Sequence, residues 1–225
     1  MMFEQLGLIG CGLMGGSFAL ALKQAGLVKR VVGYSKSPST TERARQMGVI
    51  DIEAPSALLA VSGSDLVLVA VPVAATEATF KAIRHLITRD TLVMDVGSTK
   101  RDVVDTARRV LRDKNQLTHF VPAHPIAGSE QSGVAHADAT LYNGRQVILT
   151  PLPQTQPELL QKATDVWTAI GAQVVGEDGA LGARDMAGDW IQRFDPRFWT
   201  IDFPRPMMAS AVVTAPDALR IDAFR

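Results

Sequence analysis

The sequence of 225 residues contains a single cysteine, Cys11. A lone cysteine excludes a disulfide within the chain and argues against a metal site built from several thiolates. Basic and acidic side chains number 23 each, so the formal net charge is zero. We therefore expect no metal site, and neither the basic surface that binds nucleic acid nor the basic patch that binds an anionic membrane.

Long apolar stretches are also missing. No run approaches the roughly 20 residues that cross a bilayer, and the first residues carry neither the basic segment nor the cleavage site of a secretory signal. Repeats and low-complexity tracts are absent from the sequence as well. With 47% hydrophobic and 20% charged residues, the composition favours a folded, cytoplasmic protein over a disordered one.

Short apolar runs alternate with helical patterns over the first 180 residues. The runs lie at 6–9, 31–34, 66–71, 91–95, 119–121, 146–149 and 173–175. The helical patterns lie near 14–26, 39–47, 55–61, 74–87, 100–113 and 156–170. Several runs are apolar throughout, as in strands that helices cover on both faces. This order predicts an α/β fold of the Rossmann type, with a doubly wound, mainly parallel sheet.

The pattern changes after about residue 180. Residues 181–225 contain four prolines and suit neither a long helix nor another βα unit. We therefore divide the chain into a dinucleotide-binding domain, residues 1–180, and an atypical C-terminal extension of unknown role, residues 181–225.

A glycine motif follows the first predicted strand and opens the first predicted helix: Gly10-Cys11-Gly12-Leu13-Met14-Gly15. Gly10 makes the tight turn, Gly12 lets the backbone approach a pyrophosphate, and Gly15 permits close packing of helix on strand. The helix N-terminus then offers N–H groups and a positive dipole end to the phosphates. The motif predicts a cofactor-binding turn that includes Leu13 and Met14, with Cys11 as a small buried filler.

The end of the second strand distinguishes NADP from NAD. An NAD site usually has a carboxylate there, which bonds the ribose and repels a 2′-phosphate. This chain has Ser35 at that position, about 20 residues after the glycine motif, followed by Lys36, with Arg43 further along. Ser35 can donate to a phosphate and Lys36 adds a cation, although Lys36 can also be an ordinary solvated lysine. NADP is therefore favoured, with NAD as the alternative.

Several segments resemble prephenate and arogenate dehydrogenases, in the order of that family and over about four-fifths of the chain. Those segments are Gly33–Pro38 and Gly48–Asp51 on the adenosine side, Asp65–Val73 near the cofactor, the Asp95–Lys100 turn ("D-x-G-S-x-K"), His124–Glu130 (HPIAGSE) with Ser132-Gly133, and Gly144–Pro151. The string HPIAGSE is the most specific, because 6-phosphogluconate and 3-hydroxyacid dehydrogenases share the glycine motif but lack it. The Asp65–Val73 segment adds Val71 and Pro72 to the expected cofactor contacts.

The resemblance implies a reaction without a metal: oxidative decarboxylation of prephenate to 4-hydroxyphenylpyruvate or of arogenate to tyrosine, in tyrosine biosynthesis. His124, which we expect in a loop at a strand exit, matches the histidine that accepts a hydrogen bond from the substrate hydroxyl. Its ordinary pKa of about 6.5 suits a general base near neutrality. Ser98 matches the serine that keeps hydroxyl and histidine in register, but could instead cap the following helix.

The resemblance also implies substrate contacts. Ser129 and Glu130 match positions at the substrate entrance, and Lys100 is either structural or neutralises a substrate carboxylate. The three other histidines have no motif around them, so we expect surface or structural roles for His85, His119 and His136.

The family continues from this domain into an all-helical domain that binds substrate and forms the homodimer. The extension of about 45 residues is too short for that domain and does not resemble it, which fits a truncation followed by fusion to unrelated coding sequence. Cofactor binding is therefore a safer expectation than turnover. Two alternatives stay open: another Rossmann oxidoreductase, such as a 3-hydroxyacid dehydrogenase, and a non-catalytic remnant that binds NADP.

Overall fold

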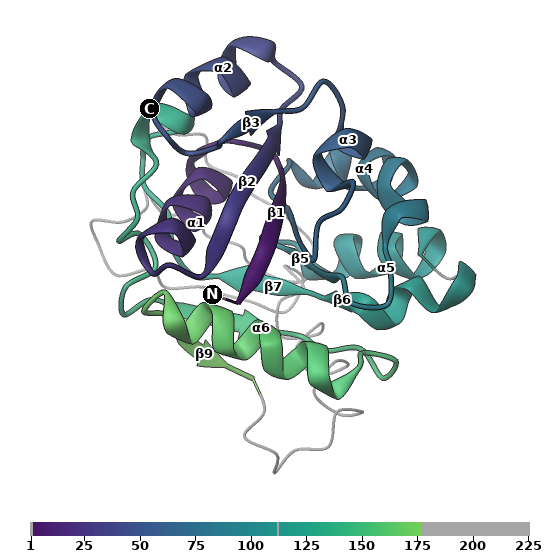
Figure 1. Ribbon diagram of the computed structural model, residues 1–225. Helices are drawn as coiled ribbons and strands as arrows, with labels where there is room; N and C mark the ends of the chain where they lie inside the picture. Colours follow the sequence, from purple (N-terminus) through teal and green to yellow (C-terminus); the bar gives the residue numbers. More distant parts are fainter. Residues whose placement is uncertain (1, 112, 177–225) are drawn as a thin grey trace, which may run out of the picture.

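The computed structural model describes residues 2–111 and 113–176, drawn in colour in Figure 1. The extension 181–225 lies outside the described residues. The strands are β1 (Phe3–Ile9), β2 (Val28–Tyr34), β3 (Ile52–Glu53), β4 (Leu66–Val69), β5 (Leu92–Asp95), β6 (Phe120–Val121), β7 (Ala123–Pro125), β8 (Gln146–Leu149) and β9 (Gln173–Val175). The α-helices are α1 (Leu13–Gln24), α2 (Pro38–Gln46), α3 (Ala57–Val61), α4 (Thr76–Ile83), α5 (Lys100–Val110) and α6 (Pro157–Ala169). Four short 3₁₀ helices are η1 (Val73–Ala75), η2 (Arg84–Leu86), η3 (Asp113–His119) and η4 (Val134–His136).

The first six strands form one parallel sheet in the order β3-β2-β1-β4-β5-β6. The chain runs outward from β1 to β3 and then returns to the other side of β1 to add β4, β5 and β6. This is the doubly wound arrangement of a Rossmann fold, and it confirms the predicted fold class. The change of direction between β1 and β4 is the topological switch point at which such sheets bind ligands.

Helices cover both faces of this sheet, with α1 and α6 on one face and α3, α4 and α5 on the other (Figure 1). The strand side chains alternate between two cores, because successive residues of a strand point to opposite faces. Leu66 and Leu68 of β4 belong to the core under α1 and α6, whereas Val67 and Val69 belong to the core under α4 and α5. Burial on both faces explains why the run at β4 is apolar throughout.

Each core has an aromatic centre. On the α1 side, the Trp167 ring of α6 lies 4.7 Å from the Phe18 ring of α1 and 5.1 Å from the Tyr142 ring. On the other side, the Phe80 ring of α4 lies 5.3 Å from the Phe120 ring of β6. These tilted or edge-on contacts are the favoured geometry for aromatic pairs, so they fix the helices against the sheet.

A smaller sheet, β7-β8-β9, extends the domain beyond β6. Strands β7 and β8 are antiparallel, with His124 opposite Ile148, and β8 and β9 are parallel. The sequence did not predict β7: we expected His124 in a loop, whereas the structure has it in the middle of a strand. A three-residue strand is too short to produce a periodic pattern. Pro125 is tolerated because β7 is an edge strand, where one side needs no ladder hydrogen bond.

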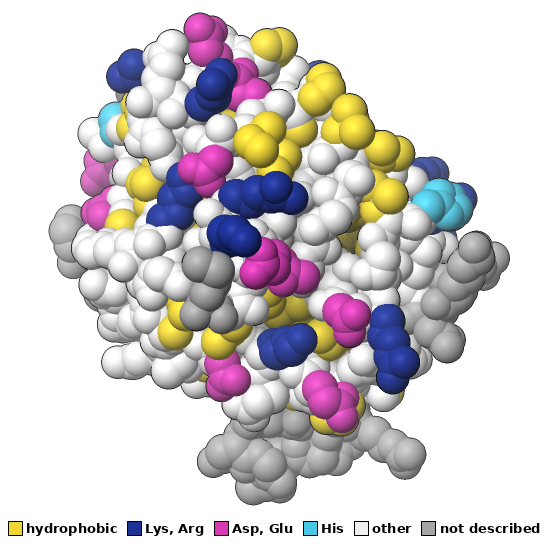
Figure 2. Space-filling model, viewed as in Figure 1, with side chains coloured by type: hydrophobic (Ala, Val, Ile, Leu, Met, Phe, Trp, Pro, Cys, Tyr) yellow, Lys and Arg dark blue, Asp and Glu magenta, His cyan; other side chains and the backbone are white. Residues whose placement is uncertain are grey.

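Two further differences concern one helix boundary and one additional strand. The helix expected at 74–87 is α-helical only over Thr76–Ile83, with 3₁₀ turns at both ends, and the short edge strand β3 was not predicted. Figure 2 shows charged side chains of both signs interspersed over the face in view, as the balanced composition suggested. None of the helices in the described part of the chain combines the length and apolarity needed to cross a bilayer.

Candidate active site

The carboxyl ends of four neighbouring strands lie in one row. The strand register aligns Ile9 of β1 with Tyr34 of β2 and Val69 of β4, and Val69 in turn with Asp95 of β5. The residues that follow these strands are therefore neighbours at one edge of the sheet, about 5 Å apart from strand to strand. This edge, at the switch point, brings together residues as far apart in the sequence as Ile9 and Asp95.

The glycine turn occupies the centre of this row. Gly10 has φ of +97°, and a Cβ there would clash with the carbonyl oxygen of Ala70, at the end of β4. A Cβ at Gly15 would clash with the Gly10 carbonyl oxygen and lie 2.9 Å from Leu8 Cδ1. At Gly12, by contrast, an added Cβ would have more than 4 Å of space to any other described atom. Packing therefore requires glycine at positions 10 and 15, whereas Gly12 keeps its face of the turn open.

Helix α1 begins at this open face. Gly12 is its N-cap residue and supplies no side chain, and the first turn, Leu13 to Gly16, consists of uncharged residues. The first N–H groups and the positive dipole end are thus left for an anion from outside the helix. Both Leu13 and Met14 are partly exposed there. A turn with an open face, uncapped N–H groups and uncharged side chains fits the pyrophosphate of a dinucleotide.

The end of β2 is tied to the same turn. The Cys11 N–H donates to Ser35 Oγ at 2.8 Å, and the Gly10 N–H donates to the Tyr34 carbonyl at 2.8 Å. The Cys11 side chain is buried, and burial raises the pKa of its thiol, so it acts as a neutral filler. Ser35 is therefore bonded to the backbone of the glycine turn, and its side chain also forms a hydrogen bond with the Cys11 side chain.

Cations rather than carboxylates follow β2. Lys36 is exposed, as is Arg43 on α2, and the first acidic residue after the strand is Glu42. At the end of β4, Val71 is partly buried and Pro72 is exposed. Lys36, Val71 and Pro72 come within three residues of the ends of β2 and β4, so they lie at the carboxyl edge where the sequence predicted cofactor contacts.

A buried ion pair lies at the next position in the row. Asp95 at the end of β5 and Lys100 at the start of α5 have side chains only 2% and 1% exposed, and Lys100 Nζ donates to Asp95 Oδ2. The same carboxylate accepts the Gly97 N–H at 2.8 Å. Asp95 Oδ1 also accepts the Ala123 N–H at 3.2 Å, and Lys100 Nζ donates to the Ala123 carbonyl at 2.7 Å.

These contacts bear on the two roles considered for Lys100. A fully buried ammonium group that is bound to Asp95 and Ala123 has no exposed surface to offer a substrate carboxylate, so the structure supports the structural role. Asp95 and Ala123 were not singled out from the sequence. A carboxylate that ends a buried strand, five residues before a lysine, is a signal that could have indicated a buried pair.

His124 follows Ala123 directly and is partly buried. Burial lowers the pKa of its imidazole to about 4, and the nearby charge of Lys100 acts in the same direction. The pKa of His124 in the folded protein therefore lies below the ordinary histidine value near 6.5. At neutral pH the imidazole is uncharged, the form that accepts a proton.

The remaining expected site residues are on exposed segments. Ser98 is exposed in the turn between β5 and α5. In this part of the described chain the residue that caps α5 is Thr99, whose side chain forms no cap hydrogen bond, so capping does not account for Ser98. Ser129 and Glu130 are exposed in the loop after β7, and Ser129 Oγ accepts the Gln131 N–H at 2.9 Å.

The other histidines have the expected structural or surface placement. His119 is buried and its Nδ1 lies 3.2 Å from the Thr91 carbonyl oxygen, whereas His85 and His136 are exposed. Among residues 2–111 and 113–176, no three metal-binding side chains converge on a point.

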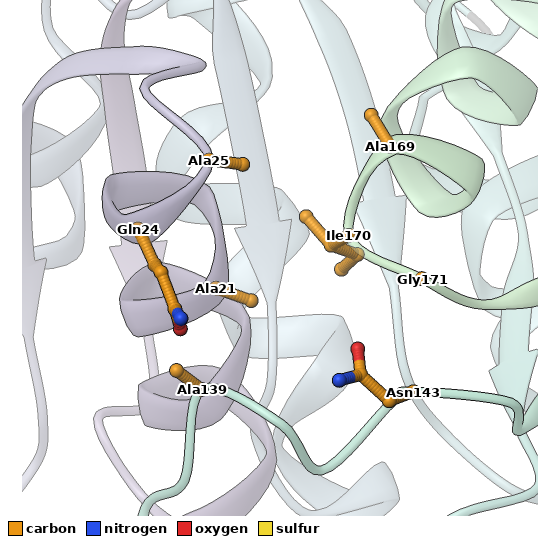
Figure 3. Close-up of a pocket in the computed structure, with 8 residues that line it drawn as sticks. All are labelled: Ala21, Gln24, Ala25, Ala139, Asn143, Ala169, Ile170 and Gly171. Carbon is orange, nitrogen blue, oxygen red and sulfur yellow. The ribbon is translucent and has the colours of Figure 1, made fainter.

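A cavity of about 260 Å³ lies between α1 and α6, away from the row of strand ends. Figure 3 shows its lining: Ala21, Gln24, Ala25, Ala139, Asn143, Ala169, Ile170 and Gly171. These residues belong to the C-terminal ends of α1 and α6 and to the segment between η4 and β8. The glycine turn, by contrast, is at the N-terminal end of α1. The cavity is therefore separate from the candidate active site.

The Rossmann sheet and the glycine turn at its switch point define a domain of the nucleotide-binding class. Residues 18–176 match the family model described as prephenate dehydrogenase, nucleotide-binding domain. This match covers more than half of the chain, which therefore belongs to the prephenate dehydrogenase family.

Relatives agree with this assignment. Over 169 residues the chain is 38% identical to a prephenate dehydrogenase of Bacillus subtilis, covering 75% of this chain and 45% of the relative. It is 34% identical over 172 residues to a cyclohexadienyl dehydrogenase of Zymomonas mobilis, covering 76% and 57%. The crystal structure of prephenate dehydrogenase from A. aeolicus, in complex with hydroxyphenyl propionate and NAD+, is similar with a TM-score of 0.71 and 32% identity, covering 78% of this chain and 60% of that one.

The chain thus spans about half the length of the curated relatives that it matches. Residues 191–225 match a different family model, the non-contractile tail sheath N-terminal domain. This second match begins beyond the last residue of the first one.

Proposed function

We propose that this chain binds NADP in preference to NAD and carries the hydride-transfer and proton-accepting half of a prephenate or arogenate dehydrogenase site. The observation that carries the proposal is the single row of strand ends. It holds the glycine turn after β1 and the Asp95 turn after β5, to which the His124 strand is bonded. A dinucleotide lying on the turn after β1 would extend along this row toward β5.

The chemistry requires two groups from the enzyme. When bound, the nicotinamide ring accepts a hydride from C4 of the cyclohexadienyl ring. The neutral His124 imidazole accepts the proton of the 4-hydroxyl group as the C4–O bond becomes a carbonyl. The electron pair of the breaking bond to the carboxylate then enters the ring, CO₂ leaves, and the proton returns to the oxygen of the aromatic product. Ser98 holds the hydroxyl and the imidazole in register.

A histidine with a pKa of about 4 suits this step. The hydroxyl group is a weak acid in the substrate, but it becomes a strong acid once hydride has left its carbon, because the product of that step is a protonated carbonyl. Even a weak base accepts such a proton, provided that it is uncharged and in hydrogen-bond reach. The neutral form of His124 therefore matters more than a pKa close to 7.

The substrate side of the site is incomplete in the proposed assignment. Ser129 and Glu130 stand at the entrance, but Lys100 is buried in its ion pair with Asp95. A cation for the substrate carboxylate would come from outside the described residues, since the chain spans only about half of its relatives. Positioning and water exclusion contribute several kcal/mol to such reactions, so turnover requires more groups than Ser129 and Glu130, whereas cofactor binding requires only the row of strand ends.

The cofactor preference is supported by the end of β2. Residues 34–41 include no carboxylate, and Lys36 is exposed beside Ser35. A 2′-phosphate would be attracted there, whereas the ribose hydroxyls of NAD would lack their usual acidic partner. The A. aeolicus relative was crystallised with NAD+, which makes a direct comparison of the two cofactors worthwhile.

The test is calorimetric titration of the full chain with NADP and with NAD, followed by a turnover assay on the same sample. We expect tighter binding of NADP, and reduced cofactor to appear with prephenate or arogenate but not with 3-hydroxyacids. A tenfold preference for NAD would refute the Ser35 argument. Binding without turnover on any cyclohexadienyl substrate would identify a non-catalytic remnant. A rate left unchanged in His124→Asn would refute the base assignment.

The two parts of the chain are proposed to have separate origins. The family match ends at residue 176, near the boundary placed at residue 180, and residues 191–225 match an unrelated family. This is the pattern that fusion of a truncated dehydrogenase domain to foreign coding sequence would leave.

A further inference from the structure

Both backbone groups of one residue, Ala123, are bonded by side chains from two other elements. Its N–H donates to Asp95 Oδ1 of β5 at 3.2 Å, and its carbonyl accepts from Lys100 Nζ of α5 at 2.7 Å. Ala123 is also the residue immediately before His124. The Asp95–Lys100 pair therefore hydrogen-bonds to the backbone of β7 one residue away from His124, the expected proton acceptor.

The strand geometry explains why these groups are free for side chains. The ladder toward β8 uses Pro122, one residue before Ala123, and Ile126, three residues after it. The Thr150 N–H donates to the Pro122 carbonyl, and the Ile126 N–H donates to the Gln146 carbonyl. Backbone groups alternate in direction along a strand, so those of Ala123 face away from β8 and toward β5. Without Asp95 and Lys100 they would be buried polar groups that lack partners.

Neither member of the pair has surface to offer a ligand, since Asp95 and Lys100 are 2% and 1% exposed. They therefore act through His124 rather than on the substrate. Strand β7 pairs with β8 and packs against β5. The charged groups beside it on β5 and α5 are Asp95 and Lys100, and all four residues of β8 are uncharged.

We propose that the Asp95–Lys100 pair is a positioning device, which fixes the backbone of β7 at the carboxyl end of β5 and thereby holds the His124 side chain near the ammonium group of Lys100. This inference rests on the proposed function only for the use made of His124. The electrostatic part agrees with the lowered pKa of His124, to which Lys100 contributes after burial. The family motif thus has a physical basis: its aspartate and lysine hold the strand that bears the histidine.

Two double variants of the full chain test the proposal. Asp95→Asn/Lys100→Gln removes both charges and keeps hydrogen-bonding groups, whereas Asp95→Asn/Lys100→Met removes the donor to Ala123 as well. Removing both charges together avoids leaving one of them buried without a partner. The His124 imidazole is titrated by NMR, with its signal assigned from its loss in His124→Asn, and amide exchange is followed along β7.

We expect the pKa of His124 to rise in both double variants, because Lys100 is the charged group that lowers it in the parent chain and its repulsion is removed. Amide exchange in β7 should become at least several times faster in the Met variant than in the Gln variant. Folded variants whose His124 titrates as in the parent chain would overturn the electrostatic part. Equal exchange rates in the two variants would overturn the positioning part.

The control is Lys23→Met. Lys23 also pairs with an aspartate, Asp51, and also donates to a backbone carbonyl, that of Gly48 at 2.9 Å, but it joins α1 to the segment after α2. We expect His124 to titrate there as in the parent chain; an equal rise of its pKa would make the effect non-specific and refute the proposal.

Neither readout depends on turnover. A chain that binds NADP but oxidises no cyclohexadienyl substrate would refute the proposed function, while the titration and exchange data still decide the role of the pair. If turnover is measured, the acid limb of the kcat/KM profile should move to higher pH in both double variants, and an unmoved limb would contradict the proposal.

Discussion

The three glycines of the turn have different physical roles. The spacing of the motif predicted the tight turn at Gly10 and the close packing at Gly15, and the structure shows both. Gly10 requires a positive φ and has no room for a Cβ, and Gly15 lies against Leu8 and the Gly10 carbonyl. Gly12 has room for a Cβ, so its glycine is not required by the packing of the protein itself. This contrast separates stability from cofactor binding.

We expect Gly10→Ala to destabilise the fold by about 2 kcal/mol or more, because a non-glycine residue at positive φ is strained and its Cβ meets Ala70. Gly12→Ala should change the unfolding free energy by less than about 1 kcal/mol, since its φ of −82° suits alanine, yet weaken NADP binding at least tenfold. Chemical denaturation and calorimetry measure the two effects.

The control is Gly26→Ala, which combines a positive φ of 64° with open space at the C-terminal end of α1. It should lower stability and leave the dissociation constant for NADP unchanged. Unaltered affinity in Gly12→Ala would show that the pyrophosphate does not approach this face of the turn.

His124 predicts a pH dependence of stability. Its folded pKa of about 4 lies below the ordinary value near 6.5, so between these values the unfolded chain binds a proton that the native chain does not. The free energy of unfolding therefore rises as pH increases from about 4 to 6.5 and is independent of this group above 6.5. The full difference is at most about 3 kcal/mol.

Urea denaturation at several pH values, in the parent chain and in His124→Asn, isolates this contribution. The parent should lose more stability than the variant on acidification, because His119 and the carboxylates change equally in both. Parallel curves would mean that His124 titrates normally in the folded protein.

At the scale of elements, α1 is fixed from two sides. Its N-terminal turn packs on β1 and β4, and its outer face meets the aromatic cluster of Phe18, Tyr142 and Trp167. The Tyr142 hydroxyl donates to the Met14 carbonyl at 2.7 Å, at the first turn of the helix. Helix α6 and the loop before β8 thereby support the helix that carries the cofactor turn.

Trp167→Ala should destabilise the protein by about 3–5 kcal/mol, because a fully buried ring is removed from the contact between α6 and α1. Thr168→Ala, one residue along and exposed on the same helix, should change stability by less than about 0.5 kcal/mol. Thermal and urea denaturation compare the two. A small effect of Trp167→Ala would show that α6 is not part of the cooperative core.

Strand β7 illustrates what sequence patterns miss at this scale. Ala123-His124-Pro125 has no periodicity and contains a proline, so it was assigned to a loop. The strand exists because Ile148 and its neighbours on β8 pair with it on one side, while Asp95 and Lys100 bond it on the other. Its partners come from 23 to 28 residues before it and about 25 residues after it, beyond the reach of a local pattern.

At the scale of the molecule, cofactor binding and folding should be linked. A ligand that binds only the folded chain stabilises it, by about 2.7 kcal/mol at a hundred times its dissociation constant. We expect NADP to raise the midpoint of thermal unfolding of the full chain accordingly, and NAD to do so less at the same concentration. The measurement is a thermal denaturation series against cofactor concentration.

Gly12→Ala is the matched variant for this series, since it should keep the fold but lose much of the shift. An equal shift in the parent chain and the variant would place the bound nucleotide elsewhere than the turn after β1. The cavity between the ends of α1 and α6 would then be the alternative position to examine.

The sequence alone was sufficient to predict the alternation of strands and helices, the cofactor turn and the family. Each of these depends on contiguous residues: periodicity reports burial, glycine at a fixed spacing reports backbone conformation, and HPIAGSE is a continuous string. Only the tertiary structure shows the burial of Lys100, the contact of Ser35 with Cys11, the strand that contains His124 and the burial that lowers the pKa of that histidine. These properties arise from burial and from contacts between residues distant in the chain, and both exist only once the sheet has brought the strand ends into one row.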